Sequence, residues 1–89
     1  MSDPQSEMNA ALEEAQRAGQ KLREAADSLR ARQHEYETAN MHGRQPQIRH
    51  ARAAFEAAQA AYEAAKRDAQ RLDDEAEEVV QAQIRAAYL

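Results

Sequence analysis

Three histidines lie near the middle of the chain at an even spacing, and histidine is a common metal ligand. His34, His42 and His50 follow one another at intervals of eight residues. Gln33 and Ala51 belong to the expected helix–helix contact. Their neighbours His34 and His50 therefore project from outer helical faces. Zinc needs ligand nitrogens about 2.0–2.1 Å from one ion, which outward-pointing side chains do not provide. We therefore expect neither a metal site nor a cofactor.

Acidic side chains are numerous but lack the setting that acid–base catalysis requires. Residues 68–78 hold six carboxylates on what we interpret as exposed faces of a helix, whereas a catalytic pair needs a concave, partly dry site. The serines Ser2, Ser6 and Ser28 have no histidine nearby in any expected fold, and two glycines cannot build a phosphate-binding loop. We therefore predict a protein that is not an enzyme and takes no small-molecule substrate.

The uneven distribution of charge suggests binding rather than catalysis. Residues 30–52 carry a net charge of +3, residues 1–14 carry −4 and residues 68–78 carry −5. An anion or a nucleic acid is the ligand that a basic segment would attract. A solvated turn is the favoured interpretation, because the whole chain carries −4 and Tyr36 is its only aromatic platform there. The candidate contacts are five arginines: Arg30, Arg32, Arg44, Arg49 and Arg52.

Two stripes of small and apolar residues predict the fold. The first comprises Met8, Leu12, Ala15, Gly19, Leu22, Ala26, Leu29, Gln33 and Tyr36, and the second comprises Ile48, Ala51, Phe55, Ala58, Tyr62, Ala65, Ala69, Leu72, Ala76 and Val79. When the chain folds back about Gly43, large residues face small ones, as Tyr36 faces Ala51 and Leu22 faces Ala65. The chain is therefore expected to be all-α: two long antiparallel helices in an alanine-rich, coiled-coil hairpin.

Capping and helix-breaking residues set the expected helix limits. Asp3 and Pro4 suit the N-cap and the first helical position. Gly43 suits a left-handed residue after a helix end, and Gly19 is expected to be a notch where the two backbones approach. The single domain, residues 1–89, then consists of a helix over about 4–41, a turn over about 42–45 and a helix over about 46–87.

One flank of the expected contact is rich in alanine and predicts a second interface. Its residues are Ala11, Ala18, Ala25 and Ala39 from the first helix, with Ala54, Ala61 and Ala82 from the second. Leu, Ile, Val and Phe make up only about 11% of the chain, which is a thin core for a small scaffold. We expect this flank to complete a four-helix bundle with a second copy or another helical protein. Surface alanine without any partner is the alternative.

A small apolar cluster closes the second helix and has two interpretations. It comprises Val79, Val80, Ile84, Tyr88 and Leu89. The cluster either packs over Met8 at the open end of the hairpin, where both termini lie, or docks a partner. On the other flank of the helix–helix contact, which carries charged residues instead of alanine, we expect an ion pair between Glu37 and Arg52. The predicted partner interface is Ala11, Ala18, Ala25, Ala54, Ala61, Val80, Ile84 and Tyr88.

These patterns favour a non-catalytic protein–protein interaction module, of a structural, adaptor or small chaperone-like kind. It would act by self-association as a homodimer or by binding a partner's helix. The alternative is RNA or DNA binding by a dimeric hairpin through the basic turn. No apolar run reaches membrane-spanning length and no signal-like start is present, so we expect a cytoplasmic protein without membrane contacts. Export without a cleaved signal stays open.

Overall fold

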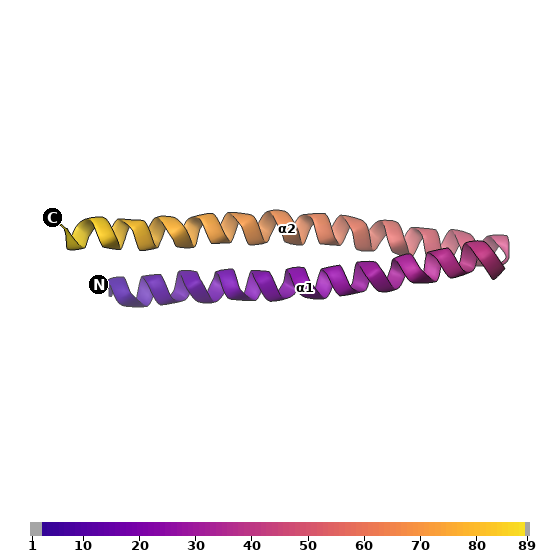
Figure 1. The fold of residues 1–89 in the computed structure, drawn as a ribbon, viewed down its shortest axis with the longest axis horizontal. Helices are drawn as coiled ribbons and strands as arrows, with labels where there is room; N and C mark the ends of the chain where they lie inside the picture. The colour runs from indigo at the N-terminus through magenta and orange to yellow at the C-terminus, as the bar shows by residue number, and fades with distance from the viewer. Residues whose placement is uncertain (1–2, 89) are drawn as a thin grey trace.

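Two long helices form an antiparallel hairpin in the computed structural model, which describes residues 3–88 (Figure 1). Helix α1 spans Pro4–His42 and helix α2 spans Gln45–Ala87. The molecule is a rod with extents of 67 × 18 × 14 Å. The predicted all-helical hairpin is therefore confirmed, and the helices begin and end within one residue of the expected limits.

The start of α1 has the expected cap. The backbone N–H of Gln5 donates to the Asp3 carboxylate at 3.2 Å, and the N–H of Glu7 donates to the Asp3 carbonyl at 3.0 Å. Pro4 occupies the first helical position, where its missing N–H removes no helical hydrogen bond. The carboxylate of Glu7 in the first turn faces the positive end of the helix dipole.

The turn consists of Gly43 and Arg44 and is tighter than expected. Gly43 has φ −87° and ψ 162°, so the predicted left-handed conformation is wrong. Glycine is needed there for a different reason, because a Cβ would lie 2.6 Å from the carbonyl oxygen of Ala39. The N–H of Gly43 donates to that same oxygen. Helix α2 then starts with Gln47 Oε1 accepting the N–H of Arg44 at 2.8 Å.

The contact stripe of α2 lies where the sequence predicts it. Its buried and half-buried residues recur at alternating steps of three and four, as a coiled coil requires. The stripe comprises Ile48, Ala51, Phe55, Ala58, Tyr62, Ala65, Ala69, Leu72, Ala76, Val79 and Gln83. Ala76 is 4% exposed and is the most buried residue of this helix.

The contact stripe of α1 is rotated relative to the prediction. It comprises Met8, Ala11, Ala15, Ala18, Leu22, Ala25, Leu29, Arg32, Tyr36 and Ala39. Ala18 is 4% exposed, whereas Leu12, which was expected in the contact, is 41% exposed. The prediction of Leu12 and Gln33 as contact residues is therefore wrong. At position 11, alanine lets the helix backbones approach more closely than the neighbouring leucine would. At the other position, Arg32 takes the contact in place of Gln33.

The register between the helices agrees with the predicted pairing. At the open end, the Gln83 side chain donates a hydrogen bond to the Pro4 carbonyl. Near the turn, the rings of Tyr36 and Phe55 lie with centroids 5.7 Å apart. Phe55 is one helical turn beyond Ala51, the residue predicted to face Tyr36, so both ends of the rod show the same alignment.

Two local expectations on α1 are wrong. The ion pair between Glu37 and Arg52 does not form, because Arg52 pairs with Glu56 at 3.3 Å and Glu37 accepts a hydrogen bond from Gln33. Gly19 is not a notch between the backbones, since no heavy atom lies within 4 Å of the place where its Cβ would be. At both sites the side chains on the flanks of the helix–helix contact do not reach across to the other helix.

Replacing each of the two glycines with alanine should change the free energy of unfolding in opposite directions. Gly19→Ala should stabilise the protein by about 0.5–1 kcal/mol, because alanine is the better helix former and finds free space. Gly43→Ala should destabilise it by about 1–3 kcal/mol through the clash with Ala39. Urea unfolding followed by circular dichroism, at a protein concentration low enough for the chain to be monomeric, measures both, and a destabilised Gly19→Ala variant would contradict the observed space.

The rotated stripe of α1 predicts a difference between two alanines of the same helix. Ala18→Gln should cost about 1–3 kcal/mol, because a long polar side chain must enter a closely packed contact. Ala31 is exposed, so Ala31→Gln should change the free energy of unfolding by no more than about 0.5 kcal/mol. Thermal unfolding of both variants checks this, and equal losses would place Ala18 outside the contact.

Candidate interaction surfaces

The predicted alanine flank does not exist as one continuous surface. Ala18 is buried, and Ala11, Ala25 and Ala39 are half-buried inside the contact between the two helices. Ala54 is half-buried, and only Ala61 and Ala82 are exposed. The placement of Ala11, Ala18 and Ala25 on an outer flank is therefore wrong. The rotation of α1 buries Ala18 within the closed hairpin, out of a partner's reach, and leaves Ala11 and Ala25 half-buried at the contact.

Two different sides flank the helix–helix contact. The Gly19 side contains a shallow groove of about 320 Å³, lined by Ala15, Gly19 and Leu22 from α1 and by Lys66, Ala69, Gln70 and Asp73 from α2. The opposite Arg71 side is lined by Glu14, Arg17, Lys21, Asp68, Arg71 and Glu75, with edges of Ala18 and Leu72. Residues seven apart stay on one side of a coiled coil. Leu12 and Ala26 therefore lie on the Gly19 side, as does Val80, seven residues beyond Asp73.

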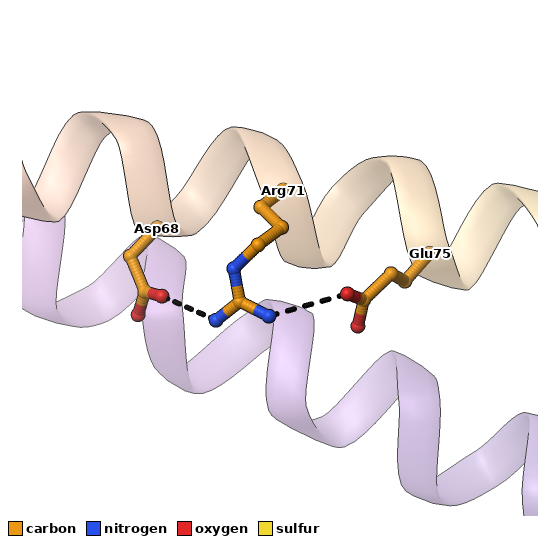
Figure 2. A network of polar contacts seen from close by, with 3 residues as sticks. All are labelled: Asp68, Arg71 and Glu75. Atoms are coloured by element: carbon orange, nitrogen blue, oxygen red, sulfur yellow. Dashed lines mark hydrogen bonds and ion pairs between the residues drawn. The ribbon is translucent and has the colours of Figure 1, made fainter.

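The Arg71 side carries a closed network of charges (Figure 2). The guanidinium of Arg71 lies 2.6 Å from the carboxylate of Asp68 and 3.2 Å from that of Glu75. The hydrogen bond and charge of Asp68, followed by the charge of Glu75, raise the pKa of Arg71 above its ordinary value. All three side chains are exposed. These three charges of α2 are thus paired with one another and in contact with water.

Apolar residues remain uncovered at the open end. Val79 and Val80 are half-buried, whereas Ile84 is 46% exposed and Tyr88 is 88% exposed. Helix α2 extends beyond the start of α1, so its last turns have no helical neighbour (Figure 1). Leu89, the last member of the predicted cluster, lies outside the described residues. The cluster therefore does not close the open end, and its exposed part is available as a surface.

The five arginines of the predicted basic site do not converge. Arg30 pairs with Asp27, Arg32 pairs with Glu35 at 3.2 Å, and Arg52 pairs with Glu56 at 3.3 Å. Among residues 3–88, no carboxylate lies within 4.0 Å of the guanidinium of Arg44 or Arg49. Only two of the five arginines are thus free of intrahelical ion pairs.

The histidines lie around the turn without forming a cluster. His34 and His42 line a shallow groove of about 480 Å³ together with Gly43 and Gln47. His50 is exposed on α2. Within residues 3–88, no group of three or more histidine, cysteine or acidic residues is arranged to hold a metal ion.

Arg32 occupies an unusual position that the sequence prediction missed. It takes a contact position of α1, seven residues from both Ala25 and Ala39, and is half-buried. Its Nε atom is shielded from solvent and has no hydrogen-bond partner among the described residues. The sequence signal for this contact position is the seven-residue spacing of Arg32 from two alanines of the contact.

Comparison with known proteins gives no match: no family model fits the chain, and no curated protein or solved structure is significantly similar to it. Within residues 3–88, neither helix has a stretch long and apolar enough to cross a membrane.

Replacing Arg32 should stabilise the hairpin. A shielded nitrogen without a hydrogen bond costs about 1–3 kcal/mol, while the exposed pair with Glu35 returns at most about 1 kcal/mol. Arg32→Leu should therefore raise the free energy of unfolding by about 1–2 kcal/mol. Arg30→Leu, at an exposed position of the same helix, is the control and should have little effect. A loss of stability in Arg32→Leu would show that the arginine is better accommodated than its geometry indicates.

Proposed function

We propose that this chain is a non-catalytic assembly module that acts by associating with a second copy or with a helix of a partner. The observation that carries the proposal is the large surface left exposed by the hairpin. The chain exposes 7033 Å², whereas a compact monomer of 10.0 kDa exposes about 5,200 Å². Only two residues of the described chain, Ala18 and Ala76, are buried.

Self-association is the favoured form of this proposal. The surface in excess of a compact monomer is about 1,800 Å², and a standard interface covers about 800 Å² on each partner. A second copy therefore supplies enough area without any change in the hairpin. A chaperone-like role, in which the helices part to admit a partner helix, would first break the close contact around Ala18 and Ala76.

Nucleic-acid binding through the turn is the second candidate, and Arg44 and Arg49 favour it because they have no ion-pair partner among residues 3–88. Between Glu37 and Glu56 the chain has no acidic residue, so the turn itself is basic. The net charge of −4 and the ion pairs of the other three arginines weaken this candidate. Binding to generic RNA or DNA that weakens steeply with salt would support it.

Sedimentation equilibrium between about 1 and 100 µM tests self-association, and we expect a dimer to form in that range, as for a modest interface. Ile84→Lys should weaken the dimer because it places a charge on the exposed apolar surface. Gln81→Lys, an exposed position on the same helix, is the matched control and should leave the dimer intact. A fully helical chain that remains monomeric at 100 µM would contradict the proposal.

A further inference from the structure

We propose that a second copy of this chain docks antiparallel on the Gly19 side, so that the open end of each hairpin lies beside the turn of the other. The inference rests on the proposed self-association and adds the surface and the orientation. Four observations support it: the uncovered apolar residues, the small residues at mid-rod, the distribution of charge and the available area.

The Gly19 side is the one that gains by being covered. Leu12 is 41% exposed and lies on this side, as does the half-buried Val80 of α2. Ile84 follows Val80 by one helical turn and lies two heptads beyond Gln70, which lines the groove of this side. The Arg71 side, by contrast, carries the ion pairs of Arg71 with Asp68 and Glu75. Covering the Gly19 side removes the exposed surface of Leu12 and Ile84 from water, whereas the lining of the Arg71 side includes none of the large exposed apolar residues.

Small residues occupy the middle of the Gly19 side. Gly19 and Ala26 lie there one heptad apart, near the midpoint of α1. A glycine inside a helix costs about 1 kcal/mol relative to alanine, and the hairpin gives no reason for it because the space around its absent Cβ is empty. Close approach of another helix supplies such a reason.

Charge selects the antiparallel orientation. Residues 3–14 and 68–88 form the open end and carry −4 each, whereas residues 15–67 carry +4. A parallel dimer would place two strongly acidic ends together, and an antiparallel dimer places each beside a basic segment. The Gly19 side follows this pattern, with Asp73 and Glu77 towards the open end and Arg49 and Arg52 towards the turn.

The available area matches what a stable dimer needs. One side of a rod measuring 67 × 14 Å spans roughly 900 Å², and a standard interface covers about 800 Å² on each partner. Full antiparallel overlap uses the whole length of the side. It also makes a two-fold symmetric contact, in which the same surface of both copies is buried.

A charge exchange tests the pairing of the two ends. The double variants Arg49→Glu with Arg52→Glu and Asp73→Lys with Glu77→Lys should each dimerise at least about tenfold more weakly, because like charges then meet at both ends. An equimolar mixture should regain the wild-type affinity to within about threefold, since every contact again joins opposite charges. Fluorescence-detected sedimentation measures both. Unaltered dimers of the two variants, or no recovery on mixing, would overturn the antiparallel arrangement.

A distance measurement tests the orientation directly, because the chain has no cysteine and accepts a single label. Gln81 is exposed and lies 15 residues from the middle of α2. In the antiparallel dimer, spin labels on Gln81→Cys should be separated by about 45 Å along the rod, at 1.5 Å per residue. Separations under about 30 Å would mean that the open ends meet, which overturns this inference but keeps self-association. A monomer at every concentration would overturn both.

Discussion

Close packing through alanine is the constraint on which the rest of this structure depends. Ala11, Ala18, Ala25 and Ala39 alternate with larger residues along α1, and alanines alternate with larger residues along much of α2 as well. Small side chains let two helices lie near the short end of the 8–10 Å range of interaxial distances. The same choice limits the apolar area that each turn buries. The hairpin therefore has a definite register but a thin core, and its larger apolar residues are only partly covered.

The sequence was sufficient to predict the architecture because helix limits and the α2 stripe each had one good solution. Along α2, Phe55, Tyr62 and Leu72 belong to a single heptad pattern, and the positions between them hold only alanine, glutamine and charged residues. Along α1, two patterns share Met8, Leu22 and Tyr36. At the remaining positions one pattern mostly has alanine where the other has leucine, glycine or glutamine. Alanine occurs readily in both buried and exposed positions, so it does not decide between the two patterns. How closely the two helix backbones pack decides which pattern of α1 forms the contact, and the sequence of α1 alone does not show this.

The candidate surfaces were harder to predict for the same reason. An error of one residue in the stripe of α1 moved three alanines from an expected interface to the contact between the helices, where Ala18 is buried and Ala11 and Ala25 are half-buried. The expected ion pair of Arg52 with Glu37 was wrong because Arg52 has Glu56 one turn away on its own helix and pairs with it at 3.3 Å. Gly43 was recognised as necessary, but the cause is the crowding against Ala39 rather than a left-handed backbone.

The two sides of the rod differ in their ion pairs and in their exposed apolar residues. Ion pairs such as Arg71 with Asp68 and Glu75 hold the Arg71 side in contact with water, and exposed pairs of this kind add little stability. Their value lies in making that side costly to cover. In the proposed dimer, the Gly19 side is the side left for a second copy, and the acidic open end sets the direction. Specificity in such a rod follows from charges that disfavour the wrong contacts, while a few uncovered apolar residues supply the attraction.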